Sequence, residues 1–134
     1  MKVIDVSKLT TRERTKLFAD FSKELSVMKT LCSCPRVVRM FGYCDMVEEQ
    51  QLALLMQLAH GGTVANLLED KSVALTDLQK GIIIHQSAMG MEYLIEHGVL
   101  HRDLKSFNLL MDKEGNIMVS LYASLPSHCT TLPV

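Results

Sequence analysis

One short polar segment, from His101 to Asn108, carries three side chains whose types and spacing suit the transfer of a phosphoryl group. The carboxylate of Asp103 could accept the proton of an attacking hydroxyl group. Asn108 offers an amide oxygen to a hard cation such as Mg²⁺. Lys105 brings a positive charge where a transferring phosphoryl group develops negative charge. The alternative interpretation is an ordinary polar turn that joins an apolar helix to an apolar strand.

This segment reads H-R-D-L-K-S-F-N and fits the catalytic-loop signature H-R-D-L-x-x-x-N. The chain therefore resembles the eukaryotic protein kinases, and Lys105 is similar to the lysine typical of serine/threonine kinases. With Leu109 and Leu110 next in the chain, the segment is most similar to the tyrosine-kinase-like, Raf-related group. The resemblance implies that Asp103 is the general base, Lys105 stabilises the phosphoryl group and Asn108 binds Mg²⁺.

A β-strand is predicted at residues 2–6, K-V-I-D-V, because the segment is short and rich in β-branched side chains. Taken alone, Lys2 is interpreted as a side chain that reaches solvent from the edge of this strand. The segment is also similar to the third strand of kinases, V-A-I-K. That resemblance implies that Lys2 holds the α- and β-phosphates of ATP and pairs with a glutamate of the next helix.

A helix is predicted after this strand, with Thr10 and Glu13 forming a capping box at its start. Glu24 falls on the apolar stripe of this helix. A carboxylate buried there without a partner costs on the order of several kcal/mol, so we expect an ion pair. The alternative is that Glu24 reaches solvent from the margin of the stripe. The resemblance makes Glu24 similar to the αC glutamate of kinases and supplies Lys2 as its partner.

Two further strands are predicted at residues 37–43 and 51–58, joined by an acidic loop. Pro35 precedes them and ends the helical region. The second strand is mostly apolar, so we expect it to be buried on both faces.

The resemblance continues this second strand into the hinge that joins the two lobes of a kinase. It implies that Met56 is the gatekeeper and that the main chains of Gln57 and Ala59 face the adenine edge. Residues 60–62, H-G-G, are interpreted as a flexible joint. Leu110 corresponds to the floor under adenine, although the sequence feature alone indicates only a core position.

Two helices are predicted beyond the hinge. A short one runs from Thr63 to Leu68, and a long one begins with the capping box of Thr76 and Gln79 and ends near Gly98. The long helix is apolar on several sides and lacks the neighbours that would enclose it. We therefore expect exposed apolar surface that a protein partner could cover, and poor solubility or a molten state for the isolated chain.

A hairpin is predicted after the catalytic loop, with strands at residues 109–111 and 117–119 around a five-residue turn. The resemblance departs from the kinase pattern in two places. No G-x-G-x-x-G occurs, so the phosphate-covering loop is expected before residue 1. Where kinases read D-F-G, this chain reads L-Y-A, and Leu121 cannot bind Mg²⁺. Our hypothesis is a truncated gene model or splice product.

The composition limits the classes of protein to consider. A chain of 134 residues with 48% hydrophobic and 22% charged residues indicates one globular domain. The net charge of −1 argues against nucleic-acid binding, and the absence of a long apolar run argues against membrane insertion. A cytoplasmic location is expected. The four cysteines lack the spacing of a zinc site, so a small metal protein is a remote alternative.

Together these inferences predict an α+β fold, a truncated, two-lobed kinase-like domain over residues 1–120, followed by an off-pattern tail over residues 121–134. The domain would hold a partial N-lobe sheet with αC, the hinge, and the first part of the helical C-lobe. The predicted function is ATP- and Mg²⁺-dependent phosphorylation of serine or threonine in a protein substrate, impaired in this chain. The alternative is a kinase-like interaction module without catalytic activity.

Overall fold

The computed structural model describes residues 2–7, 9–31, 33–46 and 51–121, without the side chains of residues 2–5, 20, 21, 23–30, 45 and 46. The described chain has mixed α and β structure, which confirms the predicted α+β class. It divides into two compact units. The first unit comprises residues up to 32 together with 39–57, and the second comprises residues 33–38 and 58–121.

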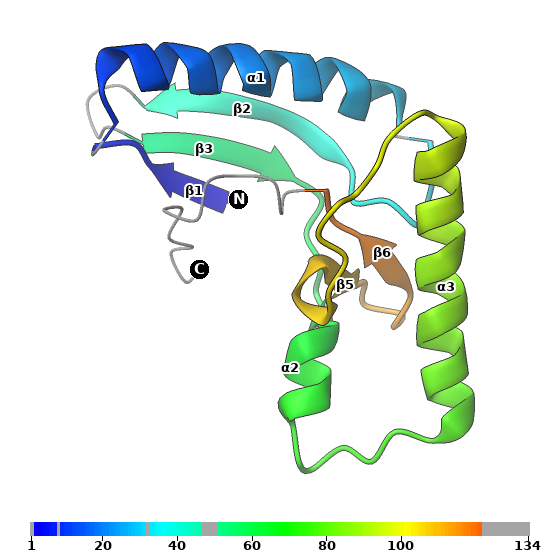
Figure 1. Cartoon of the computed structure of the whole chain (residues 1–134). Coiled ribbons are helices and arrows are strands. Elements are labelled where there is room, and N and C mark those ends of the chain that lie inside the picture. The colour runs from blue at the N-terminus through cyan, green and yellow to red at the C-terminus, as the bar shows by residue number, and fades with distance from the viewer. Residues whose placement is uncertain (1, 8, 32, 47–50, 122–134) are drawn as a thin grey trace. The chain divides into compact units, whose positions relative to one another are not determined.

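The first unit is a three-stranded antiparallel sheet with one long helix. Its strands, β1 (Lys2–Asp5), β2 (Met40–Met46) and β3 (Gln51–Met56), lie in the order β1-β3-β2. Helix α1 (Thr11–Thr30) runs along the sheet beside β2 (Figure 1). The ring of Phe18 in α1 lies 6.3 Å from that of Tyr43 in β2.

Helix α1 begins with the predicted capping box. The carboxylate of Glu13 accepts hydrogen bonds from the Thr10 main-chain N–H at 2.8 Å and from its hydroxyl at 2.7 Å. In return the Glu13 N–H donates to the Thr10 hydroxyl. These bonds satisfy two of the N–H groups that a helix start leaves without intrahelical partners.

The burial of β3 corrects one prediction. Leu52, Ala53 and Leu54 are buried, but Leu55 is 45% exposed, so β3 is not buried on both faces along its whole length. The strand also ends at Met56 instead of residue 58.

Strand β2 begins three residues later than predicted, and its neighbours explain why. Val37 forms a parallel bridge with Val119, and the Val38 N–H donates to the Val119 carbonyl at 2.9 Å, so this stretch pairs within the second unit. Only from Met40 onward does the chain pair with β3. A run of β-branched residues indicates a strand but not which strand it pairs with.

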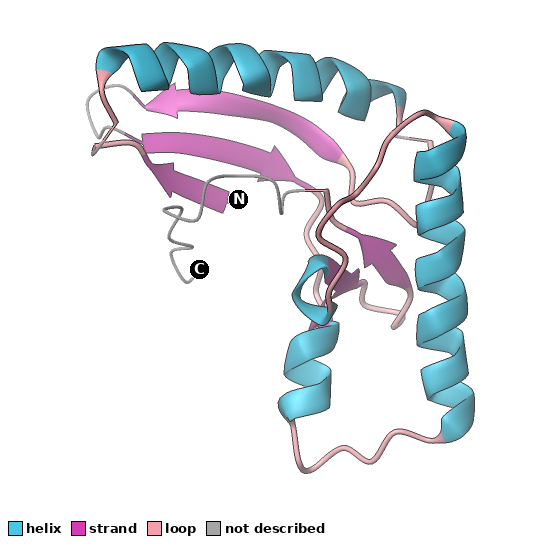
Figure 2. Ribbon diagram, in the orientation of Figure 1, coloured by secondary structure: helices cyan, strands magenta, loops and turns pink. Residues whose placement is uncertain are grey.

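The second unit is a small antiparallel sheet flanked by two helices (Figure 2). Strands β4 (Gly62–Thr63), β5 (Leu109–Met111) and β6 (Ile117–Val119) lie in the order β4-β5-β6. Helices α2 (Val64–Glu69) and α3 (Asp77–Glu96) pack against it. All three residues of β6 are buried.

In the predicted flexible joint at residues 60–62, two residues have paired backbone, and the flexibility itself stays a prediction. The Gly61 N–H donates to the Met111 carbonyl at 3.0 Å, and Gly62 pairs with Met111 in β4. A Cβ at Gly61 would lie 2.7 Å from the Asp112 carbonyl oxygen, and Gly62 has a φ of +72°. Glycine is therefore needed at position 61 for the close approach and at position 62 for the left-handed backbone.

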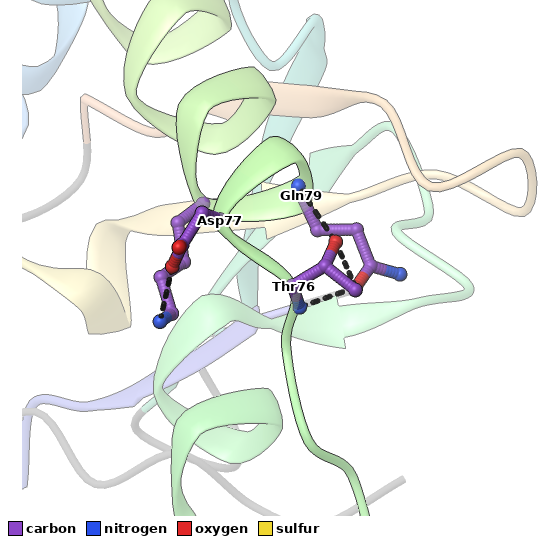
Figure 3. A network of polar contacts seen from close by, with 4 residues as sticks. Thr76, Asp77 and Gln79 are labelled. Carbon is purple, nitrogen blue, oxygen red and sulfur yellow. Dashed lines mark hydrogen bonds and ion pairs between the residues drawn. The ribbon is translucent and has the colours of Figure 1, made fainter.

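Helix α3 has the predicted start and end. The side chain of Thr76 accepts from the Gln79 N–H at 3.2 Å, and the Gln79 Oε1 accepts from the Thr76 N–H at 2.8 Å (Figure 3). Asp77 in the first turn pairs with Lys80 at 3.0 Å. Gly98 follows the C-cap with a φ of +72°, the left-handed conformation that commonly ends helices.

Much of the apolar surface of α3 is exposed among the described residues, as expected. Leu78 is 75% exposed and Ile84 is 70% exposed, whereas Leu94 is buried. The expected poor solubility of the chain stays a prediction.

Candidate active site

Residues 101–108, which we call the catalytic-loop segment, are anchored by His101. This residue is only 3% exposed. Its Nε2 lies 2.9 Å from the carbonyl oxygen of Ser120, and its Nδ1 accepts from the Asp103 N–H at 3.3 Å. A carbonyl only accepts and a main-chain N–H only donates, so the neutral ring must carry its proton on Nε2. The imidazole thus joins the loop to the residue after β6.

Arg102 turns the backbone between these two anchored residues. Its φ of +62° lies in the left-handed region. This conformation costs a residue other than glycine on the order of 1–3 kcal/mol. The Asp103 N–H also donates to the His101 carbonyl at 2.9 Å, which closes the turn. The surrounding bonds hold this conformation and direct the following residues.

The structure brings the three predicted catalytic residues together. The Nζ of Lys105 lies 2.7 Å from the Oδ2 of Asp103. The Nδ2 of Asn108 donates to the Asp103 carbonyl at 2.7 Å and to its Oδ2 at 3.3 Å. Because Asn108 uses its amide nitrogen for Asp103, its amide oxygen is left for another partner.

The pKa of the Asp103 carboxyl lies below its ordinary value of 3.8. The hydrogen bond from Lys105 is the largest cause, followed by desolvation, which opposes it, and by the charge of Lys105 and the hydrogen bond from Asn108. The carboxylate is therefore ionised at neutral pH, which is the state that a general base requires. The side chain is 39% exposed, so an outside group can reach it.

Ser120 fixes the far end of the loop through its main chain. Its N–H donates to the Asn108 carbonyl at 2.8 Å, and its carbonyl accepts from His101. Both ends of the catalytic-loop segment are therefore hydrogen-bonded to Ser120. Leu121 is the next residue in the chain.

Comparison with known proteins agrees with this arrangement. A family model described as protein tyrosine and serine/threonine kinase matches residues 2–123. The chain belongs to the protein kinase family.

Several serine/threonine kinases are similar to this kinase chain. The serine/threonine-protein kinase dst4 of Dictyostelium discoideum is 32% identical over 97 residues, which cover 72% of this chain and 20% of that protein. The mitogen-activated protein kinase kinase kinase 2 of Arabidopsis thaliana is 31% identical over 120 residues, covering 89% and 18%. The CBL-interacting serine/threonine-protein kinase 8 of the same plant is 30% identical, covering 98% and 28%. The chain thus spans less than a third of each of these relatives.

The predicted phosphate anchors of the kinase chain lie in the first unit. Lys2 is the first residue of β1, opposite Leu54, and Glu24 lies within α1. The side chains of both lie outside the described residues. Their ion pair stays a prediction.

The residues predicted to surround adenine come from two stretches of the chain. Met56, Gln57 and Ala59 lie at and after the end of β3, and Leu110 lies in β5. Met56 ends β3 and is partly exposed, and Leu110 is the partly exposed central residue of β5. The Gln57 N–H donates to the Arg39 carbonyl at 2.8 Å, so among the described residues its carbonyl is the main-chain group left for a base. The Ala59 carbonyl accepts from the Gly62 N–H at 3.2 Å, which leaves the Ala59 N–H.

Protein kinases use ATP with Mg²⁺, and the donor set of this chain fits the metal only in part. The amide oxygen of Asn108 is a suitable ligand, but Leu121 offers no oxygen where kinases place the D-F-G aspartate. Among the described residues no cluster of three or more histidine, cysteine, aspartate or glutamate side chains could hold a metal ion.

No described helix is long and apolar enough to cross a membrane.

Sequence reasoning missed two positioning features of this site. Ser120 acts through main-chain groups, which no residue type reveals. Gln86 accepts from the Ile117 N–H at 2.7 Å and from the Arg36 guanidinium at 3.2 Å, and so ties α3 to the start of β6. A polar residue inside an apolar helix was the available signal for Gln86.

Proposed function

We propose that this chain is part of an ATP-dependent protein kinase that phosphorylates serine or threonine hydroxyls. The observation that carries the proposal is the contact of Lys105 with the Asp103 carboxylate at 2.7 Å. Asp103 accepts the proton of the substrate hydroxyl, and Lys105 offsets negative charge on the phosphoryl group. The similarity to serine/threonine-protein kinases such as dst4 supports serine/threonine specificity.

In this proposal the remaining predicted residues bind the nucleotide. Lys2, oriented by Glu24, holds the phosphates, and Met56 and Leu110 pack against adenine. The Gln57 carbonyl and the Ala59 N–H offer one acceptor and one donor to the adenine edge. Asn108 is the protein ligand of Mg²⁺ that the chain retains.

We further propose that catalysis by this chain is impaired. A kinase transition state is stabilised largely by metal ions and charged groups, and Leu121 cannot supply the metal-binding carboxylate. Nucleotide binding can persist, because other residues supply the proposed adenine and phosphate contacts.

The proposal is tested by the thermal unfolding of the chain with and without Mg·ATP, beside the variant Asn108→Ala. A retained site raises the midpoint by about 2–5 °C when the nucleotide concentration is well above Kd, and less in the variant. Phosphoamino-acid analysis of a generic protein substrate tests the specificity of any residual transfer. Finding phosphotyrosine, or no nucleotide effect at all, contradicts the proposal.

The exposure of Leu78 and Ile84 favours a second candidate, a kinase-like interaction module that binds a protein through α3. The same measurement separates the two. A rise in the midpoint with Mg·ATP supports the nucleotide site, whereas a rise only with a protein partner supports the module.

A further inference from the structure

The catalytic-loop segment carries an exposed aromatic side chain to which the proposed mechanism gives no role. Phe107 is 56% exposed, although phenylalanine is among the residue types most often buried. It directly precedes Asn108 in a 3₁₀ turn, Ser106–Asn108. The ring of Phe107 is therefore accessible to an outside group beside two of the proposed catalytic residues.

The turn that carries Phe107 is fixed by hydrogen bonds on its C-terminal side. The Asn108 N–H donates to the Lys105 carbonyl at 2.8 Å, and the Asn108 side chain donates to the Asp103 carbonyl at 2.7 Å. The turn also packs against β4 and α2 within the second unit, and Figure 1 shows it next to α2. These contacts hold the main chain of Phe107 at a defined place relative to Asp103.

Phe107 lies close enough to Asp103 to contact a substrate whose hydroxyl group reaches the carboxylate. The Nδ2 of Asn108 lies 3.3 Å from the Oδ2 of Asp103. Because adjacent Cα atoms are about 3.8 Å apart, the main chain of Phe107 is within about 11 Å of this carboxylate. An extended peptide advances about 3.3 Å per residue, so the ring can reach substrate side chains up to about three residues from the phosphorylated one.

The charges of the catalytic-loop segment favour an apolar substrate side chain over a basic one. Asp103 is the only acidic residue in the sequence from 101 to 108, and its carboxylate is paired with Lys105 at 2.7 Å. The exposed Arg102 adds positive charge to the same segment. A basic side chain therefore meets no free carboxylate in this segment, whereas an apolar one removes exposed ring surface from water.

We propose that Phe107 selects protein substrates that carry an apolar residue within about three positions of the phosphorylated serine or threonine. This role rests on the proposed kinase function and adds a specificity-determining residue to it. Phe107 contacts the substrate side chain while Asp103 accepts the proton of the hydroxyl group. Substitution of Phe107 therefore changes the choice of substrate and leaves nucleotide binding unchanged.

The test measures the binding of fluorescent serine peptides to the whole chain by anisotropy, in the presence of Mg²⁺ and a non-hydrolysable ATP analogue. The peptides share one alanine-rich sequence and carry a single leucine, arginine or glutamate at each position around the serine in turn. Leucine at one position should bind about five- to tenfold more tightly than arginine or glutamate there, because it buries part of the exposed ring.

Three substitutions of Phe107 and one control assign this preference to the ring. Phe107→Ser should remove the leucine preference, Phe107→Leu should keep most of it, and Phe107→Glu should shift it to arginine. Phe41→Ser is the control, because Phe41 lies in β2 of the first unit and is 63% exposed, and this substitution should leave the preference unchanged. The thermal midpoint of each variant without ligand establishes that the chain remains folded.

The proposal is overturned if no peptide binds, if the wild-type chain prefers arginine to leucine, or if Phe107→Ser keeps the leucine preference. Leucine favoured equally at every position overturns it as well, because that pattern indicates nonspecific binding to exposed apolar surface. The rise in thermal midpoint with Mg·ATP, measured on the same samples, tests the kinase function separately. If the rise is present without a leucine preference, only the role of Phe107 is contradicted, whereas absence of the rise contradicts the kinase function itself.

Discussion

The imidazole of His101 donates to the main-chain carbonyl of Ser120 at 2.9 Å, and this bond joins the catalytic-loop segment to the end of β6. Both residues are buried, so water cannot replace the bond. The position of Asp103 therefore depends on a residue 19 positions away from the histidine.

Replacing this imidazole should loosen the loop. His101→Leu leaves the Ser120 carbonyl and the Asp103 N–H with one partner fewer, which should lower the free energy of unfolding by about 1–3 kcal/mol. Urea denaturation at low protein concentration measures the change, and faster amide exchange at Asp103 locates it. The exposed His85, replaced by leucine in the same way, is the control. Equal effects of the two substitutions would contradict the anchoring role.

The contact of α3 with the rest of the second unit requires a glycine at position 90. A Cβ there would lie 2.7 Å from both the Arg36 carbonyl oxygen and the Val119 Cγ2. Gly90→Ala should therefore destabilise the chain by about 1–3 kcal/mol. At Gly81, in the same helix, a Cβ meets no atom within 4 Å, so Gly81→Ala should stabilise by about 0.5–1 kcal/mol. Thermal midpoints that move in the same direction would argue against this packing.

Acid should weaken the Asp103–Lys105 contact. The pKa of Asp103 is lowered from 3.8, so the contribution of its carboxylate to stability is complete above that value and is lost as the pH falls through the lowered pKa. Lys105→Met should raise the pKa of Asp103 toward 3.8. The difference in thermal midpoint between wild type and this variant should therefore shrink below about pH 4.

Lys71→Met is the control for charge alone, because Lys71 is exposed and forms no ion pair among the described residues. Its midpoint relative to wild type should stay nearly constant over the same range of pH. A pH-independent effect of Lys105→Met would show that the contact does not stabilise the ionised carboxylate.

Introducing a carboxylate after Ser120 should strengthen the proposed metal-dependent nucleotide binding. Leu121→Asp supplies the hard oxygen ligand that kinases use, so the rise in thermal midpoint with Mg·ATP should increase. Leu121→Asn is the matched variant without the charge and should give a smaller increase. The double variant Leu121→Asp with Asn108→Ala tests whether both residues bind one metal ion. If they do, Leu121→Asp should no longer increase the rise in thermal midpoint with Mg·ATP. An undiminished increase would show that the two residues act independently.

The exposed apolar residues of α3 should promote self-association. Replacing Leu78 and Ile84 by lysine removes two side chains that are 75% and 70% exposed, with little loss of packing. Light scattering should show less association over a range of protein concentrations. The double substitution Lys16→Gln with Lys80→Gln, at exposed polar positions, is the control and should not improve solubility.

The sequence by itself determined the family, the H-R-D-L-x-x-x-N motif, and the helix starts at Thr10 and Thr76. These features are local, because capping residues bond within one turn and the motif residues share one loop. The tertiary structure decided that Val37 and Val38 pair with Val119, that Gly61 and Gly62 pair with β5, and that the Ser120 carbonyl holds His101. Those contacts join residues distant in the chain through main-chain atoms, which every residue type carries and no residue type specifies.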